Sequence, residues 1–111
     1  MAYDEDLAVR IRELLATDKD VVEKRMFGGL AFLIGGHMSV SVSREGGLLL
    51  RCDPGETDAL LNEPHTSPFV MRERMMDGWL RVGGAGVRTR DELARWVARG
   101  VGYARSLPPK R

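Results

Sequence analysis

Residues 30–52, LAFLIGGHMSVSVSREGGLLLRC, decide the fold predicted for this chain. Five apolar residues end at a double glycine, after which Met38, Val40 and Val42 alternate with serines. A period of two is typical of a strand with one buried face, and glycine pairs supply the positive φ angles of tight turns. A second double glycine precedes another apolar strand. The stretch predicts an antiparallel meander, with Met38 and the valines inward and the serine hydroxyls outward.

Another strand is predicted just before this stretch. Val22 and Met26 lie on one side of it, while Arg25 and Phe27 lie on the other. Because Val22 and Met26 are both apolar and point the same way, we interpret Met26 as a core residue. Arg25 and Phe27 are then expected to be an exposed pair.

Helices are predicted on both sides of the strands. Apolar residues at helical spacing indicate a helix over residues 4–16, and Asp53-Pro54 begins a second one that runs to about residue 62. Thr89 and Glu92 form a capping box at the start of the last helix. Its long apolar stripe consists of Leu93, Trp96, Val97, Gly100, Val101, Ala104 and Leu107.

Two short strands, over residues 69–72 and 79–82, complete the order α-β-β-β-β-α-β-β-α. Runs of strands between helices favour an α+β fold, an antiparallel sheet with the helices packed on one face. The 111 residues are expected to form a single domain, residues 1–111. An acidic N-terminus and the lack of any apolar run near 20 residues predict a cytoplasmic protein without a membrane span.

The charge distribution is asymmetric although the net charge is only +1. Residues 1–63 carry 7 basic and 12 acidic side chains, whereas residues 64–111 carry 10 and 4. In one interpretation the two halves neutralise each other across the fold. In the other, the basic half binds nucleic acid weakly through its charge. The residues named for that role are Arg88, Arg90, Arg95, Arg99 and Arg105.

Candidate chemistry is sparse. His37, His65 and Cys52 are the only histidines and the only cysteine, and no two of them have metal-ligand spacing. Cys52 alternates with two leucines on a strand face, which favours packing over nucleophilic catalysis. No acid–base pair or phosphate-binding motif is present. We therefore predict no catalytic residues, no cofactor and no metal.

The most distinctive segment is Arg25-Met26-Phe27-Gly28-Gly29. In a structural interpretation Met26 fills the core and the glycines bend the strand. In a functional one Arg25, Phe27, Gly28 and Gly29 contact a partner, because arginine and aromatic residues are common interface anchors.

These residues also resemble a known family. The Arg-Met-Phe-Gly-Gly core, Met76-Asp77-Gly78-Trp79 and the closing segment from Trp96 to Pro108 are similar to the N-terminal domain of TfoX/Sxy proteins. The resemblance implies an α+β domain with an antiparallel sheet and no established catalytic residues. Its founding members are regulators of natural competence that act with the cyclic-AMP receptor protein and carry a further C-terminal helical domain. This chain is expected to be a stand-alone short member.

The function expected from the sequence is that of a small, non-enzymatic cytoplasmic module that binds another protein, of the transcription- or competence-regulator type. Two alternatives stay open: a weak, charge-driven nucleic-acid binder, and an enzyme of unknown reaction.

Overall fold

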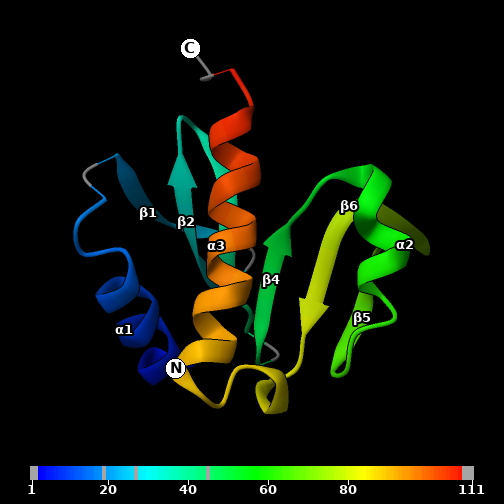
Figure 1. Cartoon of the computed structure of the whole chain (residues 1–111), viewed down its shortest axis with the longest axis horizontal. Coiled ribbons are helices and arrows are strands. Elements are labelled where there is room, and N and C mark those ends of the chain that lie inside the picture. Colours follow the sequence, from blue (N-terminus) through cyan, green and yellow to red (C-terminus); the bar gives the residue numbers. More distant parts are fainter. Residues whose placement is uncertain (1–2, 19, 27, 45, 109–111) are drawn as a thin grey trace.

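The computed structural model describes residues 3–18, 20–26, 28–44 and 46–108. Six strands form one antiparallel sheet in the order β1-β2-β3-β4-β6-β5, with helices α1 and α3 lying together on one face (Figure 1). The helices are α1 (Glu5–Leu14), α2 (Thr57–Leu60) and α3 (Arg90–Ser106). The strands are β1 (Val21–Met26), β2 (Gly29–Ile34), β3 (His37–Val42), β4 (Leu48–Arg51), β5 (Thr66–Met71) and β6 (Arg74–Val82).

This architecture confirms the predicted α+β class and order of elements. Asp4 and Thr89 cap α1 and α3, and the capping box between Thr89 and Glu92 is present. The helix predicted over residues 54–62 is shorter, a 3-10 turn (Pro54–Glu56) followed by the single turn of α2. In the part of the chain that the structure describes, no helix is long and apolar enough to cross a membrane.

The helix-covered face of the sheet holds the main core. Trp96 lies in the middle of the apolar stripe of α3 and is 1% exposed. Gly100 lets α3 lie close to β3, since a Cβ atom there would lie 2.5 Å from the carbonyl oxygen of Ser39. Cys52 is buried in the same cluster as Leu48 and Leu50, as their alternation predicted.

The prediction that Met38 faces inward with the valines of β3 is wrong. The pairing of β2 with β3 shifts register after Phe32, so that Phe32 pairs with Val40 but Leu33 pairs with Met38. The extra residue, Ser39, is buried and donates a hydrogen bond from its hydroxyl to the carbonyl oxygen of Phe32 at 2.8 Å. Because a bulge of one residue reverses the side to which the chain points, Met38 packs on the opposite face.

The inward side of β1 was also predicted wrongly. Val21 packs against the main core, whereas Val22 is 60% exposed. Met26 is half-buried and packs on the face away from α1 and α3. β1 is an edge strand, and apolar clusters lie on both faces of the sheet beside it. Alternation within the strand therefore does not indicate which face carries the larger core.

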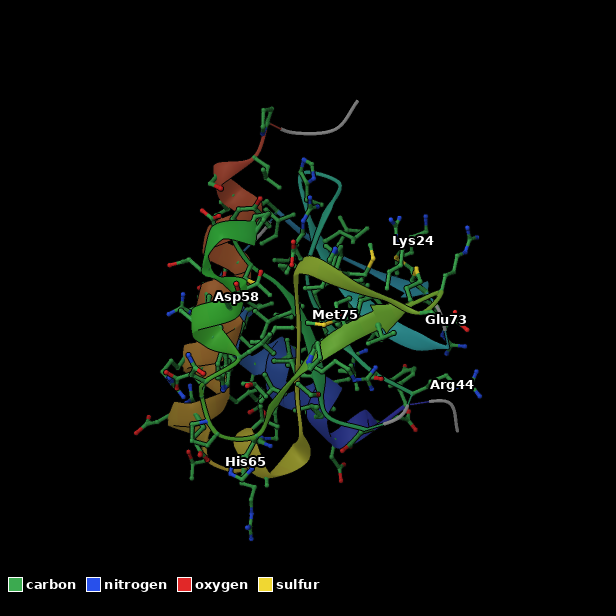
Figure 2. The ribbon with its side chains drawn as sticks, turned by 90° about the vertical axis from the view of Figure 1, so that its right-hand side faces the viewer. Lys24, Arg44, Asp58, His65, Glu73 and Met75 are labelled. Atoms are coloured by element: carbon green, nitrogen blue, oxygen red, sulfur yellow. The ribbon has the colours of Figure 1, made fainter. Side chains whose placement is uncertain are left out.

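The β5–β6 hairpin curves the sheet. Its pairing shifts between Pro68 and Val70, and Gly78 within β6 has a φ of 85°. Glu73 at the hairpin turn and Lys24 of β1 reach away from the helices, whereas Asp58 of α2 lies on the helix side (Figure 2). Met26 of one edge strand and Phe69 of the other line a single pocket on the side that α1 and α3 leave uncovered, so the sheet is concave on that side.

Candidate binding face of the sheet

The concave face, the side of the sheet away from α1 and α3, carries its own small apolar cluster. Ala31, Met38 and Leu49 are buried in it. Four larger side chains pack around them and are only partly buried: Met26, Leu33, Phe69 and Trp79. Large apolar side chains that stay partly in water are common where a protein receives another molecule.

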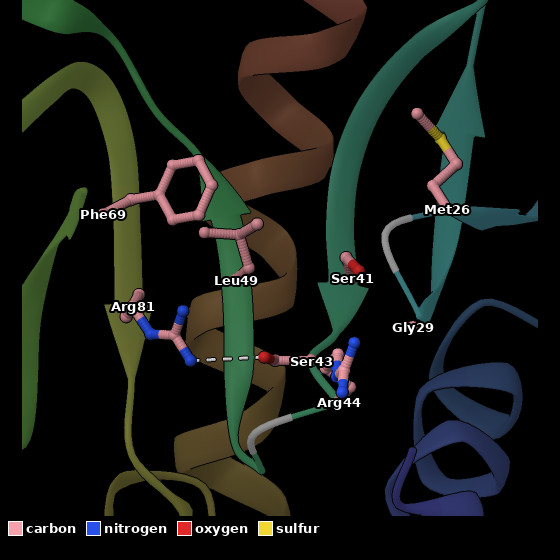
Figure 3. Close-up of a pocket in the computed structure, with 8 residues that line it drawn as sticks. All are labelled: Met26, Gly29, Ser41, Ser43, Arg44, Leu49, Phe69 and Arg81. Carbon is pink, nitrogen blue, oxygen red and sulfur yellow. Dashed lines mark hydrogen bonds between the residues drawn. The ribbon is translucent and has the colours of Figure 1, made fainter. Parts of the chain in front are cut away.

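A pocket of about 110 Å³ lies in the concave face. Every strand or its end contributes to its lining, which consists of Met26, Gly29, Ser41, Ser43, Arg44, Leu49, Phe69 and Arg81 (Figure 3). Residues from both edge strands reach one hollow because the sheet curves. Met26 and Phe69 form opposite walls, with Leu49 between them.

The polar side chains of the pocket lie at one end. Arg81 donates a hydrogen bond from Nη2 to the hydroxyl oxygen of Ser43 at 3.2 Å (Figure 3). Arg44 is exposed and makes no ion pair with any of the described residues. Ser41 is 5% exposed, and its hydroxyl has no hydrogen-bond partner within the described ranges. The pocket thus combines apolar walls with a positively charged, hydroxyl-bearing end.

The double glycine supports this end of the pocket. Gly28 has a φ of 78°, and a Cβ atom on it would lie 2.7 Å from Cδ of Arg44. Gly29 packs against the carbonyl oxygen of Val42, leaving no room for a side chain. The two glycines therefore leave room for the stem of Arg44 and for the backbone of β3.

A cluster of aromatic side chains extends the concave face toward the end of β4. The rings of Phe69 and Trp79 lie 6.1 Å apart between centroids. The guanidinium carbon of Arg51 lies 5.5 Å from the Trp79 ring and 5.7 Å from that of Tyr103 on α3. Cation–π contacts of this kind hold Arg51 at the margin of the face.

The partner-contact residues predicted from the sequence are divided by the fold. Arg25 is exposed, but by alternation it lies on the helix side of β1. Phe27 lies outside the described residues. Gly28 and Gly29 lie beside the pocket in the positions described above. The structure therefore does not bring Arg25 together with the two glycines on one face.

Sequence reasoning missed Ser41, Arg44, Leu49 and Arg81. These residues come from three strands and a turn, and only the curvature of the sheet brings them together. Alternation in β3 signalled that Ser41 faces away from Val40 and Val42. It did not reveal that Ser41 would be largely buried and line a pocket, because that position depends on neighbours from distant segments.

Most of the arginines proposed for nucleic acid are held by carboxylates from the acidic half of the chain. The ion pairs are Arg95–Glu63 at 3.2 Å, Arg99–Glu56 at 3.5 Å, and Arg105 with Asp18 at 2.8 Å and Asp20 at 2.9 Å. Hydrogen bonds from Arg105 lower the pKa of Asp20 and the two carboxylates raise that of Arg105. Such ion pairs are expected if the basic half of the chain neutralises the acidic half across the fold. The other two arginines, Arg88 and Arg90, are exposed.

The histidines and the cysteine lie in separate surroundings. No cluster of three potential metal ligands occurs among residues 3–18, 20–26, 28–44 and 46–108. Nε2 of His37 lies 2.6 Å from the carbonyl oxygen of Pro108, and His65 lies in a loop with a φ of 67°. Burial raises the pKa of the Cys52 thiol, which disfavours the reactive thiolate.

Comparison with known proteins gives one clear relationship. No curated protein and no solved structure matches the chain. The model of the TfoX N-terminal domain family matches residues 13–104, a range that includes all six strands, α2 and most of α3. On this match, which extends over most of the sequence, the chain belongs to the TfoX N-terminal domain family.

Proposed function

We propose that this chain is a non-catalytic interaction module whose concave face receives an acidic segment of another protein that carries apolar side chains. The observation that supports this proposal is the contrast between the two sides of the sheet. Helices complete the core on one side, while Met26, Phe69 and Trp79 remain partly exposed on the other.

The charges of the concave face favour an acidic occupant. Arg44 and Arg81 line the pocket, Arg51 lies beside Trp79, and Lys24 reaches out from β1. Glu73 at the tip of the β5–β6 hairpin is an opposing charge. Complementary charge steers a partner to its site and fixes its register, while the apolar side chains supply binding energy.

A non-catalytic role agrees with the family, which is regulatory or competence-related and is not known as enzymatic. The residue considered as a nucleophile, Cys52, is buried in the main core and has a raised pKa. Nucleic acid is a less favoured partner because Arg95, Arg99 and Arg105 are engaged with carboxylates.

The proposal is tested by selecting displayed peptides against the folded chain. We expect the selected peptides to be rich in Asp and Glu and to contain apolar residues. Their binding should be lost in Phe69→Ser and kept in Val9→Ser, a matched change of an exposed apolar residue on α1. Basic selected sequences, or peptides that bind both variants equally, would contradict the proposal.

The contact predicted at Arg25 and Phe27 is tested in the same assay. Arg25→Ala combined with Phe27→Ser should weaken peptide binding while thermal unfolding changes little, if these residues extend the binding face around the edge strand. A large fall in melting temperature would instead assign the segment to folding alone.

A further inference from the structure

We infer that the pocket of the concave face binds a carboxylate attached to a short, branched apolar group. This inference goes beyond the proposed function, because a pocket takes a small acid whether or not a protein docks around it. The same chemistry occurs in a free branched-chain acid and in a C-terminal leucine of a polypeptide. Both carry a carboxylate beside a small branched hydrocarbon.

The polar end of the pocket contains two groups whose hydrogen-bonding capacity is unused. Ser41 is only 5% exposed and lines the pocket. Its hydroxyl has no hydrogen-bond partner in the described ranges. Its hydroxyl oxygen is reached from the pocket, so it can donate a hydrogen bond to an acceptor that lies there. The carboxylate supplies that acceptor.

Arg44 supplies the charge. It lines the same hollow and forms no ion pair with the described residues, so its guanidinium is available for a planar anion. Arginine binds carboxylates through two parallel hydrogen bonds, a geometry that a single oxygen acceptor does not satisfy. Arg81 also lines the hollow and donates a hydrogen bond from Nη2 to the hydroxyl oxygen of Ser43.

The rest of the pocket sets the size and polarity of the ligand. Met26, Leu49 and Phe69 form its apolar walls. A cavity of about 150 Å³ holds a benzene molecule, so a volume of about 110 Å³ suits a smaller hydrocarbon such as an isobutyl group. A methionine wall adapts to branched shapes because its side chain is flexible.

Gly28 connects this site to the distinctive segment of the sequence. Since a Cβ atom at Gly28 would meet Cδ of Arg44, a side chain there displaces the arginine stem from its place beside the pocket. We therefore assign Gly28 as a positioning residue for Arg44.

The first experiment titrates the isotope-labelled full chain with 3-methylbutanoate in the millimolar range at constant ionic strength, followed by amide NMR shifts. Shifts should concentrate at residues 41–44 and at Leu49. The neutral analogue 3-methylbutanamide and inorganic phosphate, which lacks the apolar group, should each bind at least tenfold more weakly. Equal binding of acid and amide, or shifts outside the concave face only, would overturn the inference.

Matched variants identify the groups responsible. Arg44→Gln should reduce the affinity for 3-methylbutanoate at least tenfold, whereas Arg90→Gln, the same change at an exposed arginine of α3 on the helix side, should leave it unchanged. Ser41→Ala should weaken binding several-fold without lowering the melting temperature, because the removed hydroxyl has no partner to lose. Equal affinities of the Arg44 and Arg90 variants would overturn the assignment.

A second arm distinguishes the two sources of the ligand. The tripeptide Gly-Gly-Leu with a free C-terminus is compared with its C-terminal amide and with 3-methylbutanoate. Tighter binding of the free peptide supports a polypeptide C-terminus, and binding of the free acid alone supports a small metabolite. Failure of all three overturns this inference but leaves the peptide selection, and with it the proposed function, to be judged separately.

Discussion

The two faces of the sheet differ in how completely their apolar side chains are buried. On the helix-covered face, Trp96 and its neighbours on α3 close a continuous core over β3 and β4, and the largest side chains there are almost wholly buried. On the concave face, three buried residues are surrounded by larger side chains that remain partly exposed. Apolar burial of the first kind stabilises the fold, whereas partial burial of the second kind leaves contact area for another molecule.

This difference separates folding from binding within a single sheet. Changes on the helix-covered face should act mainly on the free energy of unfolding. Changes on the concave face should act mainly on binding, with smaller effects on stability.

The largest effect is expected at Trp96. Replacing Trp96 by Ala should lower the free energy of unfolding by about 3–5 kcal/mol, the usual range for removing a large core aromatic. Urea titration followed by circular dichroism measures this change. A loss below about 1 kcal/mol would show that the helix-covered face is not the main source of stability.

A smaller loss is expected at Leu49 in the concave face, which is 8% exposed. Leu49→Ala should cost about 2 kcal/mol, at the low end for buried leucines, because the partly open face lets neighbouring side chains and water fill the space. The same titration applies. If Leu49→Ala destabilises the fold as strongly as Trp96→Ala, the two faces contribute equally to stability. The assignment of folding to one face and binding to the other would then be wrong.

Gly28 should show a moderate effect on stability together with an effect on the concave face. Gly28→Ala should cost about 1 kcal/mol, because a residue with a Cβ atom is strained at a φ of 78°. The variant should also shift the NMR signal of Arg44 more than that of Arg25. Unchanged stability and an unmoved Arg44 signal would argue against the positioning role.

The smallest effect is expected from the ion pair between Arg12 and Glu23 on the helix side, whose closest atoms are 2.7 Å apart. Hydrogen bonds from Arg12 lower the pKa of Glu23, so the ionised form stabilises the fold above the ordinary glutamate pKa of about 4.3. That contribution disappears as the pH falls through the lowered pKa of the folded state. Both side chains are partly exposed, so it should be below about 1 kcal/mol.

Urea midpoints of the parent and of Glu23→Gln at about pH 6 and about pH 3 measure this contribution. The stability difference between the two proteins should narrow at the lower pH. A difference that stays constant or widens would mean that the ion pair does not contribute in the ionised form.

The amino-acid sequence alone determined the elements of local structure. Local elements depend on residues that are close together in the chain, so the spacing of those residues predicts them directly. Examples are the capping box at Thr89, the apolar stripe around Trp96 and the double-glycine turns. The burial of Cys52 beside Leu50 likewise follows from alternation within one strand.

Only the tertiary structure decided which side of each strand faces which cluster and which residues share the pocket. The bulge at Ser39 moved Met38 to the concave face, and the curvature at β5 and β6 brought Phe69 opposite Met26. The ion pairs of Arg105 with Asp18 and Asp20 likewise join the two ends of the chain. Such contacts depend on register and on sheet curvature, which arise from packing between distant segments, so local spacing does not encode them.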